Sequence, residues 1–77
     1  MSGYIARRYE LVTPSDSADL PGGLCYGLLV GTAGAASLVD GDGVRRDNVP
    51  LQAGFNPIQA WRVRATGTAA ANIFALY

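Results

Sequence analysis

Glycine and proline interrupt this chain so often that no long helix fits between them. Ten glycines and four prolines are spread over 77 residues. The apolar runs between them have the length of single strands and lack the 3.6-residue period of an amphipathic helix. Short runs at near-regular spacing, separated by turn residues, predict an all-β fold, here a small antiparallel sandwich or barrel.

The strands are expected at residues 4–12, 24–30, 35–39, 44–49, 58–65 and 72–77. Asp40-Gly41-Asp42-Gly43 predicts a hairpin turn, because Asp-Gly pairs adopt positive φ at little cost. The return strand, 44–49, is polar enough for a sheet edge, and 51–57 is expected as a loop. In 58–65, Trp61 and Val63 alternate with Arg62 and Arg64, which predicts a half-exposed strand with Trp61 packed in the core.

Two parts are expected: an N-terminal arm with a Pro/Ser loop at 1–20, and a β domain at 21–77. Residues 13–23 carry turn chemistry almost throughout, including two prolines that a central strand would not accept. The arm combines Tyr4, Arg7, Arg8 and Tyr9. This mixture of charged and aromatic side chains is suited to lying along the surface of a neighbouring protein.

Self-association is expected because so small a chain has a marginal core. Such domains are commonly stabilised by disulfides, a metal ion or oligomerisation. One cysteine, Cys25, and the absence of histidine exclude an internal disulfide and a typical zinc site. The last segment is also apolar on both faces, and both need cover. Its side chains Ile73, Phe74, Leu76 and Tyr77 are therefore the predicted self-association residues.

Catalysis and cofactor binding are not expected. Without histidine, no serine, threonine or cysteine has the usual activating base, so no catalytic residue is assigned. Asp40 and Asp42 lack the further ligands of a calcium loop, and the glycines at 27, 31 and 34 lack the spacing and the lysine of phosphate-binding loops. No metal or cofactor is predicted. A net charge of zero also argues against nucleic acid as a partner.

Two other functions remain open on the residues alone. Residues 20–39 carry no charge over the length of a membrane span, which is compatible with a small holin-like membrane protein. Glycines within the segment and acidic residues at its flanks oppose that interpretation. Trp61 and the tyrosines would suit a sugar- or peptide-binding β module.

Two stretches of the sequence resemble a known family. Val12-Thr13-Pro14-Ser15-Asp16-Ser17-Ala18-Asp19-Leu20-Pro21, followed by Gly31-Thr32-Ala33-Gly34, is similar to the beginning of short phage proteins. Arg62-Val63-Arg64-Ala65-Thr66-Gly67-Thr68 and then Asn72-Ile73-Phe74-Ala75-Leu76-Tyr77 is similar to how they end. These are the head-spike base and capsid decoration proteins of tailed phages and Rhodobacter-type gene transfer agents.

The resemblance implies a virion structural protein on the outer surface of the capsid. It would bind the major capsid protein and stabilise the head, as a decoration (cement) protein or as a head-spike base that carries a fibre. Tyr4, Arg7, Arg8 and Tyr9 become the candidate capsid contacts. Point symmetry favours a homo-oligomer, a trimer for a cement protein or a pentamer for a spike base. Nucleic acid and membrane are not expected as partners.

Overall fold

A computed structural model describes residues 5–77, and within them the chain forms strands, turns and loops but no helix. The strands are β1 (Tyr9–Leu11), β2 (Gly27–Thr32), β3 (Gly34–Asp40), β4 (Arg45–Leu51), β5 (Gly54–Asn56), β6 (Ala60–Val63) and β7 (Ala71–Leu76). Accordingly, the described residues contain no helix long and apolar enough to cross a membrane.

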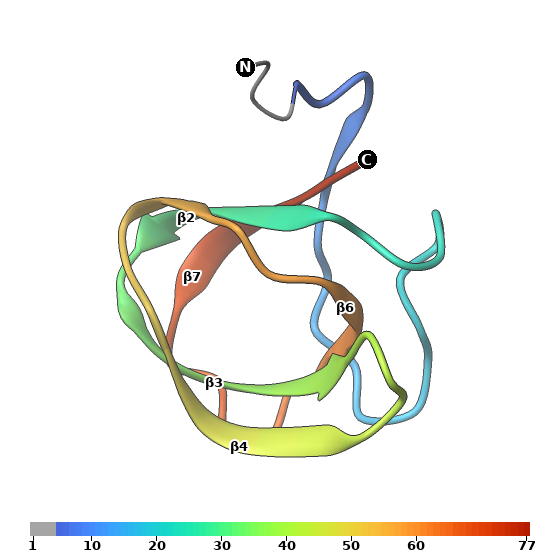
Figure 1. Ribbon diagram of the computed structural model, residues 1–77. Coiled ribbons are helices and arrows are strands. Elements are labelled where there is room, and N and C mark those ends of the chain that lie inside the picture. Colours follow the sequence, from blue (N-terminus) through green and yellow to red (C-terminus); the bar gives the residue numbers. More distant parts are fainter. Residues whose placement is uncertain (1–4) are drawn as a thin grey trace.

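The strands form two antiparallel sheets that pack against each other (Figure 1). One sheet has four strands in the order β1-β7-β2-β5, and the other has three in the order β4-β3-β6. The predicted all-β, sandwich-like fold is confirmed. The segment before β1 and the end of the chain lie together at the top of Figure 1.

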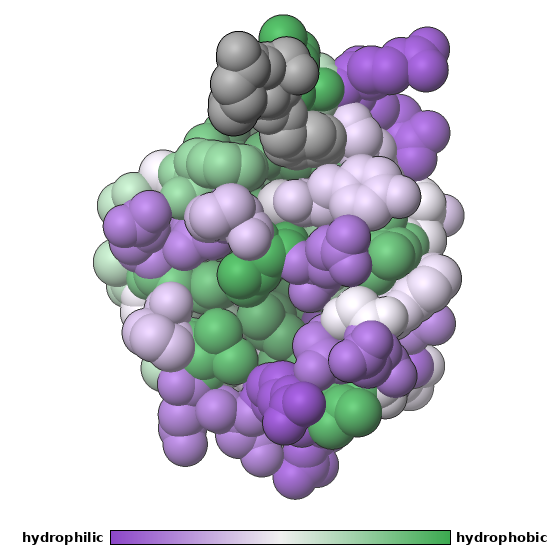
Figure 2. Space-filling model, in the orientation of Figure 1, coloured by the Kyte–Doolittle hydropathy of each residue, from purple (hydrophilic) through white to green (hydrophobic). Residues whose placement is uncertain are grey.

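The core lies between the sheets and is built from the inward side chains of both. Leu28, Val30 and Ile73 face inward from the four-stranded sheet, and Leu38 and Val63 face them from the other. In Figure 2, apolar residues occupy the centre of the view and hydrophilic residues surround them. Each fully buried aliphatic side chain contributes about 1.5–3 kcal/mol to folding, so these residues dominate the stability of a small domain.

The chain passes between the sheets at tight corners. A single residue, Ala33, separates β2 from β3. At this corner Gly34 packs so closely on the next segment that a Cβ atom would lie 2.8 Å from the Ala70 nitrogen. Only glycine fits there without moving backbone, which explains why the glycine-rich stretch bends here instead of continuing as one strand.

The hairpin between β3 and β4 is the one the Asp-Gly pattern predicts. The Asp40 N–H donates to the Val44 carbonyl, and Asp40 Oδ1 accepts the amides of Asp42 and Val44. Gly43 takes a positive φ of 81°, a conformation that glycine adopts without strain. The return strand β4 is an edge strand, as expected, and a bulge near Asn48 (φ 57°) interrupts its pairing with β3.

Two local predictions were wrong. The expected loop at 51–57 contains β5, whose pairing with β2 places Phe55 opposite Leu29. The alternation expected at 58–65 does not hold, because the β3–β6 register shifts between Val39 and Asp40. As a result Ala60 and Val63 are buried, whereas Trp61 is only half-buried and donates its indole N–H to the Gly41 carbonyl.

Residues assigned to the arm and loop are in part integrated into the sheets. Tyr9–Leu11 is the edge strand β1, paired with β7, and the side chains of Val12 and Leu20 are buried in the core. The boundary expected at residue 20 therefore does not coincide with a change in packing. A strand this short has little signal in the sequence, because tertiary pairing with β7 rather than local propensity creates it.

Candidate interaction surface

A row of large apolar side chains crosses the outer face of the four-stranded sheet. Register places Leu11 beside Phe74, Phe74 beside Leu29, and Leu29 beside Phe55. The residues next to them along β2 and β7, Leu28, Val30, Ile73 and Ala75, are buried in the core. Since side chains alternate between the two faces of a strand, the row must point away from the core.

Several members of this row are open to solvent. Leu11 is 63% exposed, Leu29 43% and Phe55 42%, while Phe74 is half-buried between its neighbours. A second pair, Tyr9 beside Leu76, lies next to the row, and Tyr9 is 67% exposed. We call Tyr9, Leu11, Leu29, Phe55, Phe74 and Leu76 the apolar face. An apolar cluster that spans four strands marks a contact surface far better than a lone exposed side chain does.

Gly27 shapes one end of the apolar face. A Cβ atom on Gly27 would lie 2.7 Å from Phe55 Cε1, so the aromatic ring occupies space that any other residue would fill. The glycine lies opposite Leu76 on β7. Its absent side chain leaves room for the Phe55 ring beside β2.

The predicted self-association residues divide between the two sides of β7. Phe74 and Leu76 belong to the apolar face. Ile73 is 2% exposed and belongs to the core of its own domain, and Tyr77, at the end of the chain, packs against that core. Leu29 and Leu11 were not singled out from the sequence, although each lies in an apolar or alternating run; Phe55 gave no signal because β5 was not expected.

The predicted capsid contacts lie around β1, except Tyr4, which is outside the described residues. Arg7 and Arg8 precede β1 and are tied to the chain end, since the Arg7 N–H donates to the Tyr77 carbonyl and the Tyr77 N–H donates to the Arg8 carbonyl. The Arg8 guanidinium lies over the Tyr77 ring at 4.5 Å and pairs with Glu10 at 3.3 Å. Tyr9 joins this group to the apolar face.

The loop between β1 and β2 covers the outer edge of β6. The Ser15 N–H donates to the Val63 carbonyl, and the Leu20 N–H donates to the Trp61 carbonyl. Asp16 fastens the loop to the turn after β6: its Oδ1 accepts the Thr66 amide and its Oδ2 accepts the Thr66 hydroxyl. These bonds from Thr66, with a smaller contribution from Arg64, lower the pKa of the Asp16 carboxyl from its ordinary 3.8.

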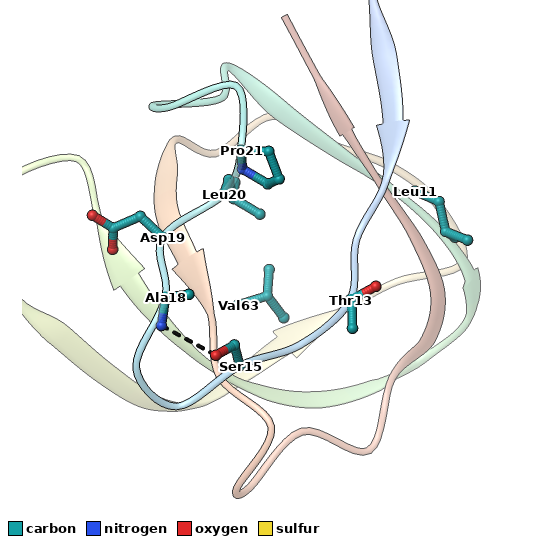
Figure 3. A pocket seen from close by; sticks show the side chains of 8 residues that line it. All are labelled: Leu11, Thr13, Ser15, Ala18, Asp19, Leu20, Pro21 and Val63. Atoms are coloured by element: carbon teal, nitrogen blue, oxygen red, sulfur yellow. Dashed lines mark hydrogen bonds between the residues drawn. The ribbon is translucent and has the colours of Figure 1, made fainter.

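A pocket of about 270 Å³ lies between this loop and the strand it follows. Figure 3 shows Val63 at its centre, with the segment from Ala18 to Pro21 on one side and Leu11 and Thr13 on the other. Small-molecule sites usually enclose about 300–1,000 Å³, so this pocket has room for one side chain rather than for a cofactor. Asp19, at its margin, turns its carboxylate outward.

Ion pairs neutralise most of the charge within the described residues. The pairs are Arg8–Glu10, Arg45–Asp47, Arg46–Asp40, Arg62–Asp19 and Arg64–Asp16. Across residues 5–77, this leaves Arg7 and Asp42 without an ion pair. Arg7 lies beside β1, whereas Asp42 is in the turn between β3 and β4 at the lower right of Figure 1.

The residues considered for chemistry have structural contacts in this fold. Cys25 is fully buried, and burial raises the pKa of its thiol from the ordinary 9.0. Asp40 holds the hairpin and pairs with Arg46 at 2.8 Å, which lowers the pKa of its carboxyl. Among residues 5–77, no group of three or more His, Cys, Asp or Glu side chains is placed to hold a metal ion.

Comparison with known proteins is informative at the level of solved structures. No protein-family model matches the chain, and no curated protein matches it significantly. A chain in a solved structure titled "Capsid of native GTA particle computed with C5 symmetry" is similar to it, with 35% sequence identity and a TM-score of 0.80. The alignment covers 95% of this chain and 84% of that one, so the similarity extends over the whole domain.

Proposed function

We propose that this chain, which belongs to the same family as a protein of a gene transfer agent (GTA) capsid, is a virion structural protein that decorates the head. The finer role we propose is that of a cement protein or head-spike base on the outer capsid surface. It binds the major capsid protein, and it assembles with itself as a trimer or pentamer. A spike base would also hold a head fibre.

The apolar face is the observation that carries this proposal. Its four exposed members, Tyr9, Leu11, Leu29 and Phe55, are between 42% and 67% exposed. Since residues of this size have on the order of 150–250 Å² of surface each, together they present roughly 400 Å² to solvent. One partner in a standard protein interface buries about 800 Å². The apolar face is therefore large enough to form the centre of such an interface, completed by a polar rim.

We assign the part of the apolar face on β2, β5 and β7, with Leu29, Phe55 and Phe74, to contacts between copies of this chain. The face contains no charged side chain, and an apolar surface of this kind is typical of homo-oligomer interfaces. It includes Phe74, which is half-buried, and Leu76, which lies on the same side of β7 but is only 8% exposed in the single chain. Burying the face on a second copy would add the apolar cover that the second side of β7 requires.

We assign the region around Arg7, Arg8 and Tyr9 to the contact with the capsid. These residues lie at the end of the molecule where the chain enters β1 (Figure 1). Arg8 is positioned by Glu10 and Tyr77, whereas Arg7 has no ion pair within the described residues. A cation without an internal partner is available to a carboxylate on a neighbouring protein.

Light scattering and capsid sedimentation test the proposal together. Purified protein should have a mass that is a multiple of its 8.0 kDa chain, and it should sediment with capsids that lack it. Leu29→Glu places a charge in the centre of the apolar face and should lower the mass to that of the monomer.

The matched control is Val44→Glu, which changes an apolar side chain of similar exposure outside the apolar face. It should leave the mass unchanged. A wild-type protein that stays monomeric and does not sediment with capsids would contradict the proposed function. A Leu29→Glu variant that retains the full oligomeric mass would contradict the assignment of the apolar face.

A further inference from the structure

The four sheet edges are protected to different degrees. The loop after β1 covers the edge of β6, and β4 is interrupted by the bulge at Asn48 and by Pro50. The edge at β5 is three residues long, begins at Gly54, with φ 99°, and is followed by Pro57. These are the devices by which proteins prevent edge strands from pairing with other chains. The edge at β1 is as short as that of β5, and the chain before it is irregular, since Arg7 and Arg8 both bond to Tyr77. Within Tyr9–Leu11, however, the edge has neither a proline nor a covering strand among the described residues.

The hydrogen bonds show which peptide groups of β1 face its open side. The Arg8 carbonyl accepts the Tyr77 amide, and the Val12 amide donates to the Ile73 carbonyl. From Arg8 to Val12, residues of even number therefore direct their peptide groups toward β7; before Arg8 the alternation breaks, because the Arg7 amide also donates to the Tyr77 carbonyl. Because these groups alternate along a strand, the N–H and C=O of Tyr9 and Leu11 point away from β7, toward the open edge.

The pocket shown in Figure 3 lies along this open edge. Leu11 and Thr13 form one wall, and no residue of β7 lines it. Its floor and opposite wall are apolar, with Val63, Leu20 and Pro21. An extended segment that paired with β1 would thus have a place for one apolar side chain beside the strand.

Arg7 places a positive charge at the same edge, which an acidic partner segment would complement. It directly precedes the strand and has no ion pair within the structure, in contrast to the other five arginines. Tyr9 and Leu11 lie on the same side of β1, and Arg7 lies just before the strand, so a cation and two apolar groups follow one another along this edge. A complementary segment would carry a carboxylate opposite Arg7.

We propose that β1 binds its partner by strand addition. The occupant is an extended acidic segment of the capsid protein, hydrogen-bonded to the peptide groups of Tyr9 and Leu11. One apolar side chain of the segment enters the pocket, and one carboxylate pairs with Arg7. Main-chain bonds supply affinity in this mode of recognition, and the pocket and the charge supply selectivity. This inference rests on the proposed function, since it specifies how the same protein holds the capsid.

Removing a single outward amide proton tests the proposal. The only cysteine, Cys25, allows the 77-residue chain to be made by ligating a synthetic 1–24 peptide to residues 25–77. A methyl group on the Leu11 nitrogen blocks strand addition but leaves every bond to β7 in place. We expect at least about a tenfold loss of binding to capsids that lack this protein, with an unchanged unfolding midpoint. The same methyl on Glu10, whose amide faces β7, should instead lower that midpoint.

Two substitutions examine the side chains. Ala18→Leu fills the pocket, and Arg7→Gln removes the unpaired charge; each should weaken capsid binding, whereas Arg45→Gln, at a distant ion pair, should not. If unmodified protein binds capsids and the Leu11-methylated protein binds equally well, strand addition is wrong while the proposed function stands. If methylation lowers the oligomeric mass without capsids present, the occupant is a second copy, and the proposed acidic segment is wrong. If unmodified protein does not bind capsids, the proposed function itself fails.

Discussion

Asp16 and Thr66, fifty positions apart in the chain, are joined by two hydrogen bonds. The Thr66 amide donates to Asp16 Oδ1 at 2.9 Å, and the Thr66 hydroxyl donates to Asp16 Oδ2 at 2.6 Å. Through this pair the loop that covers the edge of β6 is attached to the turn that follows β6. The family-like Thr-Pro-Ser-Asp stretch thus has a structural role in this chain.

Asp16→Asn should destabilise the protein, and more strongly at neutral than at acidic pH. The pKa of Asp16 is lowered in the folded state, so its carboxylate contributes stability above the ordinary pKa of 3.8. That contribution is lost as the pH falls through the lower, folded-state pKa. Urea unfolding at neutral pH and at about pH 2 measures the difference. Asp42→Asn, which changes a carboxylate without an ion pair in the structure, should have little effect; equal losses at both pH values for Asp16→Asn would contradict the charge-based explanation.

Leu28→Ala and Leu29→Ala should separate folding from association. Leu28 is fully buried, so its truncation should cost about 2–5 kcal/mol. Leu29 is 43% exposed on the apolar face, so its truncation should cost less than about 1 kcal/mol in the isolated chain but weaken self-association. Unfolding is to be followed at a protein concentration low enough to populate the monomer, and association by light scattering. Similar costs for both variants would show that the two faces of β2 are not distinct.

The Cys25 thiol should resist labelling in the folded protein. It is fully buried, and its raised pKa keeps the reactive thiolate scarce. A thiol reagent at neutral pH should therefore react at a rate limited by unfolding, and rapidly once urea is added. Leu24→Cys in a Cys25→Ala background is the comparison, since this neighbouring residue is partly exposed. Rapid labelling of the native thiol without denaturant would mean that the β2 end of the core opens readily.

Gly34→Ala should be more destabilising than Gly43→Ala. At Gly34 an added Cβ would lie 2.8 Å from backbone nitrogen of Ala70, and backbone cannot move aside cheaply. We expect a cost of about 1–3 kcal/mol or more. At Gly43 the surrounding space is empty and only the positive φ opposes alanine, which costs about 1–2 kcal/mol. Thermal unfolding of both variants gives the ranking. If Gly43→Ala proved the more destabilising, the close approach at the β2–β3 corner would not be an important constraint on the fold.

The sequence was sufficient for the fold class and for several local features. The Asp-Gly hairpin formed where its turn residues predicted it, and β7 is apolar on both sides. These features depend on local chemistry and on the two-residue alternation of a strand. The same alternation predicted two of the residues on the apolar face, Phe74 and Leu76.

Features that depend on tertiary pairing could not be obtained in this way. The strands β1 and β5 are each three residues long and exist because β7 and β2 offer them an edge. The shift in the β3–β6 register between Val39 and Asp40 moved Trp61 out of the core position that simple alternation predicted for it. Without the pairing of β5, Phe55 could not be assigned to the same surface as Leu29. The pocket beside β1 likewise needs the loop to fold back on Val63.

The internal ion pairs also affect the rate at which this protein would associate with a capsid. Because nearly every arginine is neutralised by an acid of the same chain, little electrostatic field extends into solvent. Encounter with a particle then proceeds without long-range steering, at a rate set by diffusion and by orientation. If the proposed function holds, binding to the capsid should occur at nearly the same rate in dilute and in concentrated salt, and a high affinity should come from slow dissociation.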